Sequence, residues 1–291
     1  MRVSVFGATG TVGQALLPLL ANDHDVVAVS RQPRATQGGI RWATADVASG
    51  VGVADAIDGA DVVYYLVHSL GQGDYQAKDS HAATRVSREA AQARVSQIVY
   101  LGGLGADHPH ASAHLRSRRE TGDRLAADGV PVTTLRAAMV IGKGSAAFET
   151  ILALVKRLPV MITPSWVSTP TQPIALPDVA RYLAAVAGSQ EALGTGYDAG
   201  GPEVMTYRQM IERIAALLGR RPRIVEVPVL TPALSALWLE LVTPVNASVA
   251  RPLIEGLRNP TIAREERLRQ LVPFELTSFD AATREALRAS G

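Results

Sequence analysis

Three glycines near the start of the chain have the spacing of a phosphate-binding turn. Gly7, Gly10 and Gly13 form G-x-x-G-x-x-G between an apolar run, Val3–Phe6, and a helical pattern, Thr11–Leu20. In such a turn the first glycine permits the tight bend, the second lets the backbone approach a pyrophosphate, and the third lets helix and strand pack closely. The free N–H groups and the dipole of the helix N-terminus favour a negatively charged group. The pattern predicts a nucleotide-binding turn made by Gly7, Ala8, Thr9, Gly10, Thr11, Val12 and Gly13; the alternative is a structural turn that binds nothing.

The end of the second predicted strand, Asp25–Arg31, bears on which nucleotide is bound. A dinucleotide site that prefers NAD usually has an acidic residue there, because a carboxylate bonds the ribose hydroxyls. This chain has Ser30 and Arg31 instead. A guanidinium can pair bidentately with a 2′-phosphate, so the sequence favours NADP(H) over NAD(H). The alternative for Arg31 is a solvated side chain at the mouth of a loop.

Residues at the ends of the next two strands complete the expected nucleotide site. Asp46 and Val47 follow the third strand and suit the adenine, with a carboxylate for its amino group and an apolar contact for its ring. His68 lies at the carboxyl end of the fourth strand, where ligands bind in open α/β sheets. We therefore expect Leu66, Val67 and His68 to contact the cofactor and His68 to take part in catalysis. A structural, hydrogen-bonded histidine is the alternative.

Alternating strands and helices must position these residues. The predicted strands are Val3–Phe6, Asp25–Arg31, Ile40–Val47, Gly59–Ser69, Ser96–Gly103 and Val130–Gly142, and the helices between them include Thr11–Leu20, Ala77–Arg94 and Leu115–Asp128. This alternation predicts an α/β fold of the Rossmann type, a doubly wound parallel sheet with helices on both faces.

The regular alternation of predicted strands and helices ends after Gly142. Helices are predicted at Leu176–Ala187 and Thr206–Gly219, with Thr206 as an N-cap, and two short helices within Thr231–Pro260. We expect residues 1–142, completed by about residues 171–200, to form the nucleotide-binding core. Residues 143–170 and 201–291 are expected to form a smaller, mostly helical C-terminal lobe.

The composition excludes several classes of function. The 291 residues include 29 Lys and Arg and 27 Asp and Glu, and no basic stripe marks a nucleic-acid partner. The chain has no cysteine, which excludes disulfides, thiolate catalysis and thiolate-bound metal. His108, His110 and His114 lie near Asp107, but Pro109 interrupts the spacing, so we expect no metal site. No secretory leader and no apolar run of roughly 18 residues is visible, which predicts a cytoplasmic protein without a membrane partner.

The order of these motifs resembles the short-chain dehydrogenase/reductase superfamily, in its extended and atypical branches. The segments GATGTVG, VVYYLVHS, IVYLGGLG, LRAAMVIGKGS and PIALPDVARYL match landmarks of that superfamily in order. More narrowly, YLVHS, HLRSRRETGD and LVTPVNASVARPLIEGLRNP are similar to segments of the NmrA-like and YbjT-type NAD(P)-binding proteins. The resemblance covers nearly the whole chain and implies NAD(P)(H) as the cofactor.

The resemblance also gives a test for catalytic residues. Working dehydrogenases of the superfamily use a serine and Tyr-x-x-x-Lys, in which the tyrosine donates a proton and the lysine lowers its pKa and holds the ribose. The corresponding positions here are Gly102 and Gly103 for the serine, His114 for the tyrosine and Arg118 for the lysine. The standard mechanism therefore does not carry over. His114 could still exchange a proton, and Arg118 could bind the nicotinamide ribose or a phosphate and keep His114 neutral. Cofactor contacts are then expected from Gly102 and Arg118, with His68 and His114 facing one pocket.

Two main functions remain open. The preferred one is an atypical NAD(P)H-dependent oxidoreductase acting on a small carbonyl or quinone-like acceptor. His68 and Trp166 favour it, although Trp166 could either stack on a planar ligand or simply pack. The other is a non-catalytic NAD(P)(H) sensor or assembly protein, which the three altered positions favour. A nucleotide-sugar epimerase or dehydratase is the third. The helices Ala77–Arg94 and Leu115–Asp128 would suit a homodimer interface.

Overall fold

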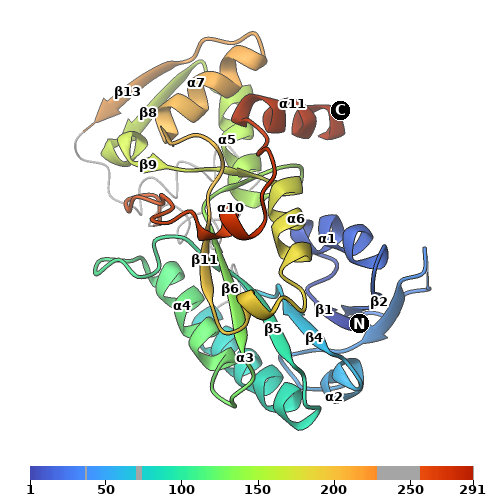
Figure 1. Cartoon of the computed structure of the whole chain (residues 1–291). Coiled ribbons are helices and arrows are strands. Elements are labelled where there is room, and N and C mark those ends of the chain that lie inside the picture. Colours follow the sequence, from blue (N-terminus) through green and yellow to red (C-terminus); the bar gives the residue numbers. More distant parts are fainter. Residues whose placement is uncertain (37, 70–73, 228–255, 291) are drawn as a thin grey trace.

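A parallel sheet of seven strands forms the centre of the structure. The computed structural model describes residues 1–36, 38–69, 74–227 and 256–290 (Figure 1). The strand order is β11-β6-β5-β4-β1-β2-β3, and every neighbouring pair is parallel. The strands are β1 (Arg2–Phe6), β2 (Asp25–Ser30), β3 (Arg41–Thr44), β4 (Val62–Tyr65), β5 (Gln97–Gly103), β6 (Val132–Ala137) and β11 (Gly196–Ala199). The predicted Rossmann-type fold is confirmed, and the strand order reverses between β1 and β4, where ligands bind in such sheets.

Helices cover both faces of this sheet because the side chains of each strand alternate between two cores. On β4, Val62 and Tyr64 point to the core under α1 and α6, whereas Val63 and Tyr65 point to the core under α2, α3 and α4. The two groups of helices lie on opposite sides of the sheet (Figure 1). Their bounds are α1 (Thr11–Ala21), α2 (Val53–Ile57), α3 (Tyr75–Gln92), α4 (Ala113–Leu125) and α6 (Leu176–Ala185).

A smaller lobe has its own apolar core. It is built on α5 (Ala146–Arg157), α7 (Tyr207–Leu217) and α11 (Phe279–Ser290), with buried residues such as Phe148 and Met210 between them. Short strand pairs lie outside the large sheet: β7 (Val140–Ile141) with β10 (Ile174–Ala175), β9 (Pro170–Thr171) with β12 (Met205–Thr206), and β8 (Val160–Pro164) with β13 (Arg223–Val227). The other helices in the described part of the chain are η1 (Ser165–Ser168), η2 (Gln190–Ala192) and α10 (Arg267–Leu271).

Some predicted elements have different bounds in the structure. The strand predicted at Val130–Gly142 divides into β6 and β7, because residues 140–141 leave the large sheet and pair with β10. The strand predicted at Gly59–Ser69 ends at Tyr65, since its neighbour β1 ends at Phe6 and turns. Thr206 is the N-cap of α7, as predicted, and the structure adds a capping box with Gln209. The helices predicted within Thr231–Pro260, together with Trp238, lie outside the described residues apart from residues 256–260.

One buried amide joins two neighbouring strands of the large sheet to the turn after α6. The side chain of Gln97 on β5 is fully buried and donates to Thr133 Oγ1 (2.8 Å) and to the carbonyl of Val186 (3.0 Å). Its oxygen accepts from the backbone N–H of Gly188 (2.7 Å). The amide therefore connects β5, β6 and the turn after α6.

We predict that Gln97→Leu lowers the free energy of unfolding by about 2–4 kcal/mol, because the Val186 carbonyl and the Gly188 N–H lose their partner. Urea denaturation followed by circular dichroism measures the change. Gln92→Leu, at an exposed position on α3, is the control and is expected to change stability by less than about 0.5 kcal/mol. Equal effects of the two substitutions would contradict the structural role of Gln97.

Candidate functional site

At the glycine turn between β1 and α1, three backbone segments approach closely: the end of β1, the residue after β4 and the first turn of α1. Gly7 has φ +84°, and a Cβ there would lie 2.8 Å from the backbone carbon and oxygen of Leu66 after β4. A Cβ on Gly13 would lie 2.4 Å from the Gly7 carbonyl oxygen. Gly10 is the N-cap of α1 and, because it has no side chain, makes no capping hydrogen bond to the first turn of this helix. The turn thus offers backbone N–H groups to an anion and fits a pyrophosphate.

Other residues of the turn have different environments. Ala8 is buried in the core under α1 and α6, and Val12 packs against that core. Thr9 is exposed, and its carbonyl accepts from the side chain of Gln14 (2.9 Å). The Thr11 hydroxyl donates to the carbonyl of Gly144 (2.8 Å), which precedes α5. This bond attaches the turn to the smaller lobe.

The residues predicted for the adenosine end lie beside the turn, at the carboxyl ends of β2 and β3. Ser30 is nearly buried, and its hydroxyl accepts from the backbone N–H of Gln32 (3.2 Å). Arg31 is exposed and forms no ion pair within the described part of the chain. Asp46 accepts from the N–H of Ala48 (3.0 Å), so its carboxylate shapes its own turn. Val47 packs into the core under α2 and α3.

The structure brings His68 and His114 together. Their ring centroids are 5.8 Å apart, with the ring planes inclined at 40°. His68 follows β4, and His114 lies in the first turn of α4, which Ser112 caps by accepting from the N–H of Leu115 (3.2 Å). Leu66 and Val67, which lead to His68, are partly buried. Two histidines from distant segments therefore lie side by side at the carboxyl edge of the sheet.

Arg118 lies one helical turn after His114 and is held against β5. Its guanidinium stacks over the ring of Tyr100, 5.0 Å from the ring centroid, and donates to the Leu101 carbonyl. Its Nη1 is buried and has no hydrogen-bond partner among the residues that the structure describes. Gly102 follows on the same strand, where a Cβ would lie 3.3 Å from the Tyr100 ring. A buried donor without a partner, beside a residue without a side chain, fits a site for an anionic or hydroxyl group of a cofactor.

Burial and charge keep both histidines neutral. Burial, and after it the positive charge of Arg118, lowers the pKa of His114 to about 4. The crowding of its ring by neighbouring atoms, the charge of Arg118 and then His114 lower the pKa of His68 as well, although the residue as a whole is exposed to solvent. At pH 7 each ring is then a neutral imidazole, which donates a hydrogen bond but carries no proton to release easily.

Three buried polar residues beneath the histidines were not predicted as part of the site. Asp79 on α3 is 2% exposed and accepts from the backbone N–H of Ser69 (2.8 Å), the residue after His68. Burial raises the pKa of Asp79. The Tyr100 hydroxyl donates to the Arg118 carbonyl (2.7 Å), and the Tyr65 ring lies 6.3 Å from that of Tyr100. The available signal was a carboxylate on the apolar stripe of α3, three and four residues before the buried Ala82 and Ala83.

The other candidate residues are not part of this site. Trp166 packs edge-on against Tyr207, with ring centroids 6.0 Å apart, in the core of the smaller lobe. His110 donates its backbone N–H to Nδ1 of His108 (3.2 Å). Within the described ranges, no three acidic, histidine or cysteine residues are grouped as metal ligands would be. No described helix combines the length and apolar character needed to cross a membrane.

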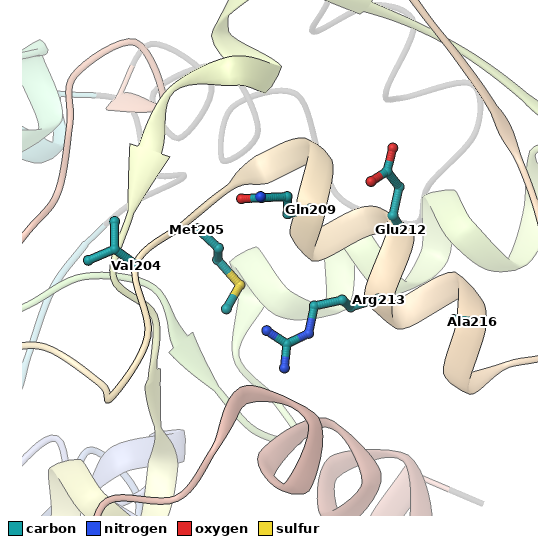
Figure 2. Close-up of a pocket in the computed structure, with 6 residues that line it drawn as sticks. All are labelled: Val204, Met205, Gln209, Glu212, Arg213 and Ala216. Atoms are coloured by element: carbon teal, nitrogen blue, oxygen red, sulfur yellow. The ribbon is translucent and has the colours of Figure 1, made fainter.

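A cavity of about 330 Å³ on the smaller lobe is also separate from the histidines. Figure 2 shows its lining, which comes mainly from α7 and the segment before it: Val204, Met205, Gln209, Glu212, Arg213 and Ala216. The Arg213 guanidinium already binds Glu203 (2.5 Å) and Asp280 (2.8 Å). The bond to Asp280 joins α7 to α11, so Arg213 serves the structure of the lobe.

Comparison with known families identifies the cofactor class. A match to the NAD(P)H-binding family extends over residues 7–153, from the glycine turn into α5. The chain belongs to this NAD(P)H-binding family. The resemblance of its motifs to the atypical short-chain dehydrogenase/reductase superfamily is confirmed, and the nucleotide predicted from the three glycines is NAD(P)H.

Individual relatives include reductases and an epimerase. The chain is 26% identical over 233 residues to a (4-alkanoyl-5-oxo-2,5-dihydrofuran-3-yl)methyl phosphate reductase of Streptomyces griseus, covering 78% of this chain and 77% of the relative. An NADPH-dependent quinone oxidoreductase of Escherichia coli, solved with NADPH, superposes with a TM-score of 0.78 at 20% identity, covering 99% and 100% of the two chains. A nucleoside-diphosphate-sugar epimerase of Staphylococcus aureus gives 0.77 at 16% identity, covering 97% and 100%. Reductases and epimerases share this fold, so the fold alone does not choose between them.

We predict that Gly10→Ala weakens NADPH binding at least about tenfold, because the new methyl group lies where the backbone must approach the pyrophosphate. The same substitution leaves thermal stability nearly unchanged, since its Cβ meets only the Gly7 carbonyl oxygen, at 3.3 Å. Calorimetric titration measures the affinity. Gly7→Ala is the matched comparison and lowers the melting temperature, because its backbone conformation and the Leu66 backbone exclude a Cβ. Unchanged NADPH affinity in folded Gly10→Ala would contradict the assignment of the turn.

Proposed function

We propose that this chain is an NADPH-dependent reductase of a small carbonyl or quinone-like acceptor. The observation that carries the proposal is the pair of neutral histidines, His68 and His114, beside Arg118 at the carboxyl edge of the sheet. The glycine turn lies at the same edge, where a dinucleotide bound at β1 extends along the ends of β4 and β5. The reductase activity of the Streptomyces griseus relative supports the reaction class.

Different residues of the chain would bind different parts of NADPH. The glycine turn and the N-terminus of α1 would hold the pyrophosphate, and Arg31 the 2′-phosphate. Arg118, with its buried Nη1, would hold the nicotinamide ribose or a phosphate oxygen. Asp46 and Val47 would border the adenine. Bound NADPH would supply the hydride.

The histidines would act on the oxygen of the acceptor. Because their pKa values are lowered, the imidazolium forms are scarce at pH 7, which argues against either ring as the main proton donor. A neutral imidazole instead donates a hydrogen bond to an oxygen on which negative charge develops. This role suits a quinone, whose reduced oxygen can take its proton from water. The Tyr65 hydroxyl lies on the same face of the sheet as α4, but it is fully buried beneath the site and does not replace the missing tyrosine.

A second candidate function is a sensor of NAD(P)(H) that does not transfer hydride. The observation that favours it is the substitution of all three standard catalytic positions, at Gly102 or Gly103, His114 and Arg118. Such a protein would bind the nucleotide equally well. Turnover, and not binding, distinguishes the two candidates.

We predict that His114→Ala lowers kcat for a soluble quinone such as menadione at least about tenfold, through the loss of one hydrogen bond to the developing oxyanion. NADPH affinity should change little, because the nucleotide is held elsewhere. Steady-state rates and calorimetry measure the two quantities. His110→Ala, at an exposed loop position, is the control.

The pH dependence of the same rate tests the protonation state. A neutral His114 with a pKa of about 4 predicts a kcat that stays level as pH rises through 6.5. An imidazolium donor with an ordinary pKa would instead lose activity across that range. A decline centred near pH 6.5, absent in His114→Ala, would contradict the hydrogen-bond role. No turnover with any acceptor, despite tight NADPH binding, would favour the sensor.

We predict that Arg31→Ala weakens NADPH binding by about 10- to 100-fold, the loss expected for a charge-assisted hydrogen bond, and NADH binding by less than about twofold. Calorimetric titration with each nucleotide measures the difference. Arg34→Ala is the control, because the Arg34 guanidinium stacks on Trp42, 5.1 Å from its ring centroid. Equal losses of NADPH and NADH affinity in Arg31→Ala would remove the preference for NADP(H).

A further inference from the structure

A face of aliphatic side chains is open to solvent on the smaller lobe. β8 and β13 pair in parallel, with Val160 opposite Arg223 and Ile162 opposite Val225. Side chains alternate along each strand, so these four point to the same side. Val160 is 47% exposed, Ile162 49% and Val225 47%. The intervening Met161 and Ile224 pack toward the core of the lobe. Figure 1 shows this strand pair at the end of the molecule remote from α2 and α3.

Basic residues border this face. Lys156 and Arg157 are exposed in the last turn of α5, just before β8, and Arg220 and Arg221 are exposed just before β13. The backbone N–H of Arg223 donates to the carbonyl of Pro159 (2.9 Å), which fixes the two segments at one edge. We call this set the basic–aliphatic patch: Lys156, Arg157, Val160, Ile162, Arg220, Arg221, Arg223 and Val225.

Four basic residues of the patch have no acidic partner among the residues that the structure describes. Lys156, Arg220, Arg221 and Arg223 form no ion pair with any residue in the described part of the chain. The acidic residue of β13, Glu226, lies near the other end of the strand. It is engaged by Arg208 (3.6 Å) and by the hydroxyl of Ser168 (3.2 Å). The patch therefore combines positive charge with exposed aliphatic surface.

We propose that the basic–aliphatic patch docks the protein on an anionic lipid surface. A bilayer interface offers phosphate and carboxylate headgroups to the basic residues and an acyl boundary to Val160, Ile162 and Val225. A second copy seated on the same patch would set like charges against each other. Nucleic-acid interfaces are polar and would leave the three aliphatic side chains without apolar partners. The contact is peripheral and independent of catalysis.

Sedimentation of the full chain with lipid vesicles tests the proposal. Binding is expected to vesicles of phosphatidylcholine with phosphatidylserine, weaker at high salt, and not to phosphatidylcholine alone. The triple variant Arg220→Gln, Arg221→Gln, Arg223→Gln is expected to lose about 100-fold in affinity, at about fivefold per basic residue near an anionic surface. Ile162→Ser should weaken binding without changing its salt dependence.

A matched triple variant controls for net charge. Arg88→Gln, Arg94→Gln, Arg284→Gln removes the same charge from exposed positions on other elements and should keep wild-type vesicle binding. NADPH titration without vesicles confirms that every variant is folded, and it stays informative whether or not the chain proves to be a reductase. Equal binding to neutral and anionic vesicles, no binding to either, or equal losses in the two triple variants would overturn the proposal. Self-association that Ile162→Ser abolishes, in the absence of vesicle binding, would assign the patch to a second copy.

Discussion

The absence of side chains at Gly7 and Gly13 is the constraint on which the site depends. Because neither residue has a Cβ, the end of β1, the backbone of Leu66 and the first turn of α1 meet within van der Waals distance. This contact fixes the direction of the N–H groups at the N-terminus of α1. It also fixes the point at which the chain leaves β4 and continues to His68. Nucleotide binding and the placement of His68 therefore share one origin, although Gly7 and His68 are some 60 residues apart in the sequence.

The positive charge of Arg118 and the burial of the groups around it limit the chemistry that His68 and His114 can perform. Arg118 is held by the Tyr100 ring and the Leu101 carbonyl, and it adds to burial in lowering the pKa of both histidines. Tyrosine and lysine at positions 114 and 118 would supply a proton. In the proposed reductase, histidine and arginine would supply a hydrogen bond and a permanent charge, which would favour acceptors that need polarisation more than protonation.

Local patterns predicted the parallel sheet, the glycine turn and the N-cap Thr206, because spacing and alternation determine them. The shared edge of a parallel sheet also allowed His68 and His114 to be placed near each other. The sequence did not indicate the end of β4, the hydrogen bond from Ser69 to Asp79, or the transfer of residues 140–141 to another strand pair. Each depends on where a distant segment stops or packs. The basic–aliphatic patch was not predicted for the same reason, since α6 and α7 lie between β8 and β13 in the sequence.

The position of β11 has a consequence for how the chain folds during synthesis. β11 covers the edge of β6 through pairs such as Thr134 with Gly196, and the Arg136–Asp198 ion pair (2.6 Å) joins the same two strands. The ribosome must therefore extend the chain by about 60 residues before this edge can be covered. In that interval the nascent sheet presents an unpaired strand, rich in β-branched residues, to its surroundings. The segment that closes the sheet arrives after α5 but before α7 and α11, so the order of synthesis allows the sheet to be completed before the smaller lobe.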